Sequence, residues 1–152
     1  MNSLPEITTS STIYADDVQL LFSGSPNNLE HLKICAETSL NTMKEWYSEN
    51  GLKINSNKTQ YILFATPKFD KRTETFQIRI DDTVRHMEDK VKNLGVIFDS
   101  SLSFEHHIIS LCSRLNGTLS HLNIVKNTLD QESRILLINA IIFSHPNYCS
   151  SI

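Results

Sequence analysis

The sequence of 152 residues contains no long apolar run and no excess of basic residues. No stretch is apolar enough to cross a bilayer, and residues 1–11 lack the basic region and apolar core of a signal peptide. We therefore expect an intracellular protein, in the nucleus or cytoplasm, with no membrane partner. The net charge of −3 is not that of a dedicated nucleic-acid binder, so any such contact must come from local patches.

Cysteine, glycine and proline are also scarce, with three, four and four residues respectively. The cysteines are odd in number and widely spaced, which argues against a disulfide framework and favours reduced thiols. Low-complexity tracts and internal repeats are absent. What remains is an ordinary globular composition, 39% hydrophobic and 20% charged, with a length that suits one compact domain.

Two adjacent carboxylates, Asp16 and Asp17, stand between short runs of β-branched and aromatic residues. The runs 12–14 and 18–22 predict a tight β-hairpin with the acids at or beside its tip. Like charges about 4 Å apart repel by roughly 4 kcal/mol at an effective dielectric constant near 20, so we expect a cation to offset them. Mg²⁺ takes one or two protein carboxylates and otherwise prefers water and phosphate oxygens. The hairpin therefore predicts part of a metal–phosphate site, with solvated turn residues as the alternative.

Beyond the hairpin, the periodicity predicts an α+β fold. Ser25 as N-cap and Pro26 at the first helical position begin an amphipathic helix that runs to about Glu49, where Asn50-Gly51 stops it. Runs rich in apolar, β-branched and aromatic residues predict strands over 59–64, 76–80, 84–87 and 91–99, and the run 76–80 alternates cleanly.

Two helices are expected in the last third of the chain. Ser103 caps the first, and Gly117 interrupts it. Asp130 caps the second, an almost continuously apolar helix that Pro146 terminates.

The motif order resembles that of the reverse transcriptases of non-LTR (LINE-like) retrotransposons. Tyr14-Ala15-Asp16-Asp17 resembles the third palm motif of these enzymes. Trp46, the run 50–55 and Asn57-Lys58-Thr59 resemble the fourth, although Gln60 stands where an acid is more usual.

The resemblance continues toward the C-terminus and covers residues 2 to about 148. Leu94-Gly95-Val96 with Asp99 resembles the hairpin that grips the primer end, although Asn93 stands where an aromatic residue is common. The resemblance implies a partial polymerase palm over residues 1–99, an antiparallel hairpin and strands packed on a helix. It implies the start of a helical thumb over residues 100–152.

The resemblance also implies residue roles for a Mg²⁺-dependent nucleotidyl transfer on an RNA template and a DNA primer. Asp16 and Asp17 would ligate the metal, and Lys58 would protonate the departing pyrophosphate. A lysine suits that task because its ammonium group both neutralises and protonates a phosphate oxygen. The alternative for Lys58 is a solvated loop residue.

Nucleic-acid contacts are expected at three places. By resemblance, Tyr14 at the hairpin and Leu94-Gly95 at the primer-end motif would contact nucleic acid, and Gly95 would let a backbone approach closely unless it forms a simple bulge. Lys68, Lys71 and Arg72 make the connection 66–72 the clearest candidate for phosphate contact, or else an exposed charged loop.

The two acids supply only part of a polymerase site. Phosphoryl transfer by two metals needs carboxylates from two places to clamp ions about 4 Å apart. In the resembled family the other set comes from an earlier strand, which would here precede residue 1, as would the fingers. We therefore expect weak Mg²⁺ binding and no polymerisation by the chain alone, unless the N-terminal palm and fingers act in trans. The alternatives are a non-catalytic nucleic-acid-binding remnant and a marginally folded chain without a stable role.

Overall fold

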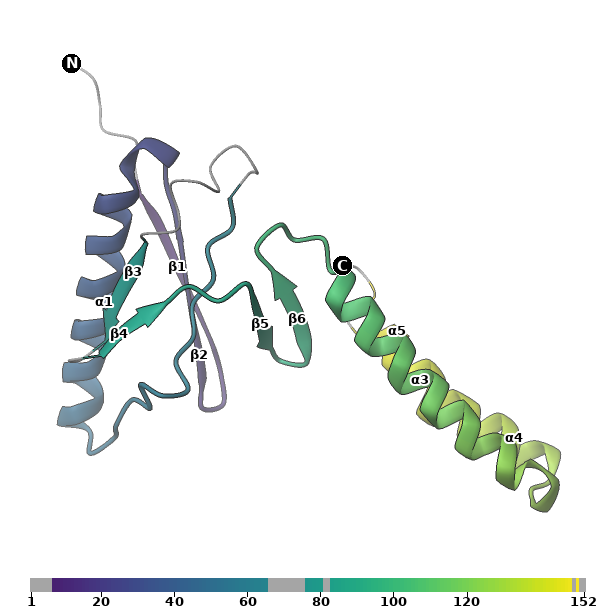
Figure 1. Cartoon of the computed structure of the whole chain (residues 1–152). Coiled ribbons are helices and arrows are strands. Elements are labelled where there is room, and N and C mark those ends of the chain that lie inside the picture. The colour runs from purple at the N-terminus through teal and green to yellow at the C-terminus, as the bar shows by residue number, and fades with distance from the viewer. Residues whose placement is uncertain (1–6, 66–75, 81–82, 149, 151–152) are drawn as a thin grey trace. The chain divides into compact units, whose positions relative to one another are not determined.

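The computed structural model of the chain describes residues 7–65, 76–80, 83–148 and 150. The chain divides into two compact units, Met1–Glu88 and Asp89–Ile152. Both units combine helices with antiparallel hairpins (Figure 1), so the predicted α+β class is confirmed. A functional division between residues 99 and 100 stays a prediction.

The first unit begins with the predicted hairpin. Strand β1 (Thr8–Tyr14) pairs antiparallel with β2 (Asp17–Ser23), in a register that runs from Thr8 opposite Ser23 to Tyr14 opposite Asp17. The hydroxyl groups of Thr8 and Ser23 share a hydrogen bond of 2.6 Å at the open end. The strand propensity of both runs and the short loop between them produce this structure as expected.

The first long helix also begins and ends where the sequence predicts. Ser25 is the N-cap of a short 3₁₀ turn, η1 (Pro26–Asn28), which leads into α1 (Leu29–Glu49). Gly51 follows with a φ of +71°, a conformation that glycine adopts without a steric penalty.

Helix α1 packs against a second hairpin, formed by β3 (Gln77–Ile80) and β4 (Thr83–His86) (Figure 1). Alternate residues of β3 are buried, because successive strand side chains point to opposite faces. Glu37 of α1 adds a polar link, since its Oε1 accepts a 2.8 Å hydrogen bond from the Arg79 backbone N–H. The buried core of the unit consists of Ala36, Phe76, Ile78 and Ile80, surrounded by Phe22, Leu29, Leu32, Leu40, Tyr61 and Leu63.

The strand predicted over 59–64 is wrong: within the described residues this segment belongs to no sheet. A side chain rather than a backbone ladder fixes it. The Tyr61 hydroxyl donates to the carbonyls of Phe76 (2.8 Å) and Arg85 (3.2 Å), and burial raises the pKa of this phenol. Tyr61, Ile62 and Leu63 are half-buried, and burial of a segment on one side does not require strand pairing.

In the second unit, the single strand predicted over 91–99 is also wrong. The segment forms a hairpin in which β5 (Lys90–Asn93) pairs antiparallel with β6 (Val96–Asp99). Leu94 and Gly95 form the two-residue loop, with φ values of +44° and +88°. Positive φ at both loop positions is the signature of a type I′ turn, whose twist matches that of the flanking strands.

The next helix, α3 (Glu105–Val125), departs from the sequence prediction at two points. Its N-cap position is Phe104, with a φ of +58°, rather than Ser103. The Ser103 hydroxyl donates to Asp99 and accepts a 3.3 Å hydrogen bond from the N–H of Glu105, the first residue of the helix. Gly117 does not interrupt the helix, which passes through it without a break. The cost of a mid-helix glycine, about 1 kcal/mol relative to alanine, does not break a helix held by neighbouring turns.

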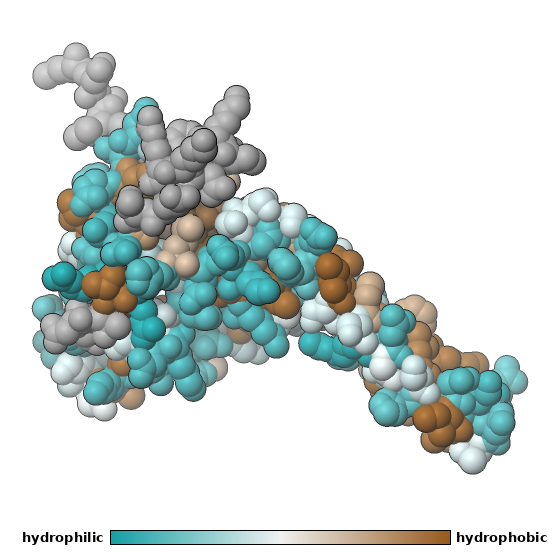
Figure 2. Space-filling model, viewed as in Figure 1, coloured by the Kyte–Doolittle hydropathy of each residue, from teal (hydrophilic) through white to brown (hydrophobic). Residues whose placement is uncertain are grey.

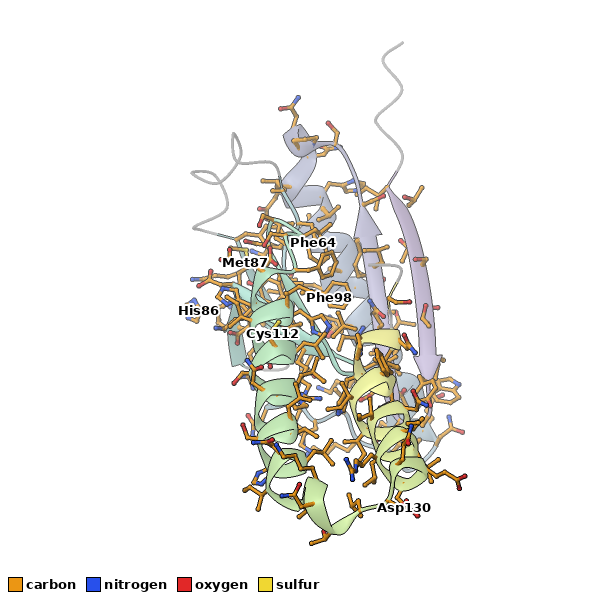
Figure 3. All side chains as sticks on the ribbon, turned by 90° about the vertical axis from the view of Figure 1, so that its right-hand side faces the viewer. Phe64, His86, Met87, Phe98, Cys112 and Asp130 are labelled. Atoms are coloured by element: carbon orange, nitrogen blue, oxygen red, sulfur yellow. The ribbon has the colours of Figure 1, made fainter. Side chains whose placement is uncertain are left out.

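A short 3₁₀ turn, η3 (Lys126–Thr128), precedes the last helical region. This region consists of α4 (Gln131–Leu137), a π-helical segment η4 (Ile138–Phe143) and α5 (Ser144–Asn147). Asp130 caps α4 as predicted, because its Oδ1 accepts a 2.8 Å hydrogen bond from the Ser133 backbone N–H. Figure 3 labels Asp130 at the bend where the chain turns back along α3.

Pro146 does not terminate this region as predicted, but lies within α5. A proline ring clashes with the carbonyl of the residue four positions earlier in a regular α-helix, here Ile142. Ile142 belongs to the π-helical segment, where the wider turn alters that spacing. No helix in the described part of the chain is long and apolar enough to cross a membrane.

The helices of the second unit expose large apolar side chains (Figure 2). Ile124 and Leu136 are 76% and 69% exposed, and Ile109, Ile135 and Phe143 are also exposed. Extended exposed apolar surface in a protein commonly marks a contact surface.

Candidate functional site

The tip of the β1–β2 hairpin carries the two predicted acids. Ala15 and Asp16 form the two-residue loop, and Asp17 is the first residue of β2, opposite Tyr14. Ala15 has a φ of +53° and Asp16 has no positive φ, the sign pattern of a type II′ turn. An alanine in left-handed conformation costs roughly 1–2 kcal/mol. Strain of this kind is common where a turn places functional groups.

The tip side chains are open to solvent. Tyr14 is 66% exposed, and both acids are exposed. In the residues that the structure describes, neither carboxylate accepts a hydrogen bond or forms an ion pair. Exposed oxygen ligands without partners fit a hard cation such as Mg²⁺, which coordinates one or two carboxylates and retains water. The described residues contain no group of three or more His, Cys, Asp or Glu that could hold a metal.

Lys58 lies in a tight turn of the same unit. The turn is organised by Asn55, whose carbonyl oxygen accepts from the N–H groups of Lys58 (3.0 Å) and Thr59 (3.1 Å). The Asn55 side-chain oxygen accepts from the Asn57 N–H at 3.1 Å. The backbone at Lys58 is thereby fixed, while its side chain is exposed and makes no ion pair within the described residues.

Arg85 of β4 braces this turn. Its Nη2 donates to the Ser56 carbonyl at 2.6 Å and to the Asn57 Oδ1 at 3.0 Å. Its buried Nε has no hydrogen-bond partner among the described residues. No local sequence pattern predicts this contact, because the interacting residues are 28 and 29 positions apart.

The Leu94-Gly95 turn of the second unit is held by Tyr148 from the C-terminal end. The Tyr148 hydroxyl donates a 2.6 Å hydrogen bond to the Leu94 carbonyl. A Cβ added at Gly95 would lie 3.4 Å from Tyr148 Cε1, so the tyrosine ring packs close to the turn. The predicted primer-end residues therefore form an exposed turn, and Tyr148 fixes it from a segment 54 residues away.

Asp99 anchors the other end of this hairpin. It is only 7% exposed, and its oxygens accept from the Ser101 hydroxyl (2.7 Å), the Ser103 N–H (2.9 Å) and the Phe104 N–H (2.7 Å). Hydrogen bonds from the Ser101 hydroxyl and then the Ser103 N–H hold the pKa of the Asp99 carboxyl well below its usual range. Asp99 thus joins the end of β6 to the start of α3.

The predicted site residues are distributed over the two units. Tyr14, Asp16, Asp17 and Lys58 belong to the first unit, and Leu94 and Gly95 to the second. No hydrogen bond or ion pair joins Lys58 to either acid in the described part of the chain. The remaining predicted residues, Lys68, Lys71 and Arg72, lie outside the described residues.

Comparison with known families gives one finding. The family model described as reverse transcriptase (RNA-dependent DNA polymerase) matches residues 1–98, more than half of the chain. No match was found among curated proteins or solved structures. The matched region includes the acidic hairpin, the Lys58 turn and the Leu94-Gly95 turn. The chain therefore belongs to the reverse transcriptase family, whose members bind a nucleic-acid template and primer.

Proposed function

We propose that the chain is a segment of the RNA-directed DNA polymerase of a non-LTR retrotransposon, comprising the later part of the palm and the start of the thumb. The observation that carries this proposal is the acidic β1–β2 tip, with both carboxylates exposed on a tight turn. The order of the following motifs, around Lys58 and then Leu94-Gly95, supports the non-LTR type.

In this proposal Asp16 and Asp17 hold Mg²⁺ through their carboxylate oxygens. The ion, when bound, neutralises charge on the phosphate groups of the incoming nucleotide. The exposed and unpaired state of both acids supports the assignment, because no protein cation has to be displaced. Two carboxylates from one turn make a weak site by themselves.

Lys58 is the proposed proton donor. Its Nζ would give a proton to the departing pyrophosphate oxygen and be replenished from solvent. The hydrogen bonds of the Asn55 turn and those from Arg85 support this role, because they fix the backbone position from which the Lys58 side chain extends. An ammonium group on a rigid turn loses less entropy when it engages a phosphate.

An RNA template and a DNA primer are the proposed partners. Tyr14 would contact the strand end at the metal site, and the Leu94-Gly95 turn would contact the primer backbone. Support for the second contact comes from the turn itself, which is exposed and whose Gly95 lacks a side chain. Lys68, Lys71 and Arg72 would add phosphate contacts.

We further propose that the chain alone does not polymerise and needs a palm and fingers segment supplied in trans. Two-metal phosphoryl transfer uses carboxylates from two places, and the hairpin tip supplies one of them. The functional unit would then be an assembly in which this chain contributes Asp16, Asp17 and Lys58.

Primer extension tests this function. The purified chain, with Mg²⁺, dNTPs and a DNA primer on an RNA template, should give no product alone. It should give product when mixed with a separately produced palm and fingers segment of a non-LTR enzyme. Asp16→Ala should abolish the product, whereas Glu45→Ala, which removes an exposed acid of α1, should leave it unchanged. Extension by the isolated chain, or extension insensitive to Asp16→Ala, would contradict the proposal.

A further inference from the structure

A cavity of about 270 Å³ lies within the second unit, at the meeting point of the β5–β6 hairpin, α3 and α5. Residues far apart in the sequence line it, including Lys92 of β5, Arg114 of α3 and His145 of α5. Arg114, His145 and Tyr148 lie beyond residue 98, where the reverse transcriptase match ends. The part of the lining that comes from α3, α5 and Tyr148 therefore lies outside the family match, whereas Leu94 and Gly95 lie within it.

The pocket is positively charged. Lys92 and Arg114 form no ion pair within the described residues, and no Asp or Glu lines the cavity. This contrasts with the whole chain, in which 17 acidic residues outnumber 14 basic ones. Two uncompensated cations facing one cavity favour an anionic ligand.

A histidine adds a polar group to this lining. His107 Nδ1 accepts a 3.4 Å hydrogen bond from the Ile97 backbone N–H. An acceptor at Nδ1 places the ring proton on Nε2, so the imidazole retains one N–H donor for a ligand. His107 is thereby oriented by the β6 backbone.

The rest of the lining is apolar and aromatic. Leu94, Ile97 and Leu111 contribute apolar surface, and the Tyr148 ring stands at the edge, fixed by its 2.6 Å hydrogen bond to the Leu94 carbonyl. An apolar wall with one aromatic ring and a few charged groups is the usual composition of a pocket for an organic ligand. A bare inorganic ion would leave this wall unused.

We propose that this pocket binds a phosphate monoester of mononucleotide size. The phosphate pairs with the Arg114 guanidinium, which can donate two parallel hydrogen bonds, and with the Lys92 ammonium, which acts as a point charge. Together the two cations match its two negative charges. The base lies against the apolar wall and Tyr148, because aromatic rings stack on nucleobases. The volume, below the roughly 300–1,000 Å³ of pockets for drug-sized ligands, limits the occupant to about one nucleotide. The ligand is either a free mononucleotide or the 5′-phosphate end of a strand.

Calorimetric titration of the full chain tests this proposal. The ligands are deoxyadenosine 5′-monophosphate, deoxyadenosine, inorganic phosphate, and one short oligonucleotide with and without a 5′-phosphate. We expect the monophosphate to bind at least tenfold more tightly than deoxyadenosine, because only the monophosphate forms charge-assisted hydrogen bonds with Arg114 and Lys92. It should also bind more tightly than inorganic phosphate, which cannot use the apolar wall.

Matched variants locate the binding. Arg114→Gln and Lys92→Gln should each weaken the monophosphate about tenfold or more, whereas Lys126→Gln, an exposed site of the same unit outside the cavity, should change it less than twofold. Both cations are exposed, and circular dichroism checks the fold of each variant. Should one variant unfold, the other decides the question.

The ligand series distinguishes a free mononucleotide from the 5′-phosphate end of a strand. Binding of the monophosphate alone identifies a free nucleotide site, and binding of the 5′-phosphorylated oligonucleotide alone identifies a strand-end site. Both results support the proposal. It is overturned if neither the monophosphate nor the 5′-phosphorylated oligonucleotide binds at millimolar concentration, if the ligand without the phosphate binds equally well, or if neither variant weakens binding. The inference does not rest on the polymerase role, because this titration needs neither Mg²⁺ nor primer extension.

Discussion

At the scale of single residues, Asp99 shows how a buried carboxylate organises a junction. Its oxygens satisfy the backbone N–H groups of Ser101, Ser103 and Phe104, which begin the approach to α3. Helix starts leave such N–H groups without intrahelical partners. The left-handed conformation of Phe104 is held in place by this network.

The network predicts a dependence of stability on pH. The folded-state pKa of Asp99 lies below its unfolded value of about 3.9, so the ionised form favours the folded state. This stabilisation is complete above about pH 5 and is lost progressively as the pH falls through the unfolded-state pKa toward the folded-state pKa. Urea unfolding between pH 6 and pH 2.5 should show a steeper acid loss for the natural chain than for Asp99→Asn.

Asp130 supplies the control for that measurement. It is exposed, and hydrogen bonds from the Ser133 hydroxyl and N–H, assisted by Arg134, also lower the pKa of its carboxyl. Solvent screens the charge of an exposed group. Asp130→Asn should therefore reduce the acid-induced loss of unfolding free energy less than Asp99→Asn does. If the natural chain and Asp99→Asn lost the same unfolding free energy between pH 6 and pH 2.5, the role given to Asp99 would be contradicted.

Single site residues differ in how far the sequence predicts them. The acids of the tip could be found because the hairpin signal around Asp16 and Asp17 is local. Lys58 and the Leu94-Gly95 turn were predicted as functional from the order of the motifs, because their immediate sequence does not by itself indicate a catalytic or binding role. Lys92 and Arg114 could not be found, because only tertiary packing brings β5 and α3 to one cavity.

At the scale of elements, local turn chemistry decided which predictions held. The acidic hairpin and α1 were predicted correctly because a tight turn and a capped start coincide with strong periodicity. The segment 91–99 was misjudged because Leu94 adopts a positive φ that its side chain disfavours. The segment 59–64 was misjudged because Tyr61 replaces a strand ladder with two side-chain hydrogen bonds.

Two glycines of the second unit should respond in opposite ways to alanine. Gly95→Ala should destabilise the unit by about 1–2 kcal/mol, because the turn requires a φ of +88°. Gly117→Ala should stabilise it by about 1 kcal/mol, because α3 is helical there and the added Cβ meets nothing within 4 Å. Chemical denaturation of both variants measures the difference. A stabilising Gly95→Ala would refute the type I′ turn.

At the scale of the whole molecule, the chain has a net negative charge although its family binds nucleic acid. Binding must therefore rely on local groups of basic residues rather than on the overall field. The exposed apolar helices of the second unit offer a further contact surface (Figure 2).

The local-charge argument predicts a salt dependence. Affinity for a primed template should fall as salt rises, with a logarithmic slope of roughly 0.7–0.9 per phosphate contact. Charge reversal at Lys68, Lys71 and Arg72 should lower that slope by about 2–3 and weaken binding at low salt. Fluorescence anisotropy between 50 and 300 mM salt measures both effects. An unchanged slope would exclude Lys68, Lys71 and Arg72 from the nucleic-acid interface.

The central claim, that Asp16 and Asp17 hold a divalent metal, is tested most directly by paramagnetic broadening of backbone amide signals. Mn²⁺ prefers the same oxygen ligands as Mg²⁺ and broadens the signals of nearby nuclei. We predict selective broadening at Tyr14, Ala15, Asp16 and Asp17 that excess Mg²⁺ reverses and Asp16→Asn removes. Broadening that is no stronger at the tip than at Glu45, or that persists in Asp16→Asn, would contradict the claim.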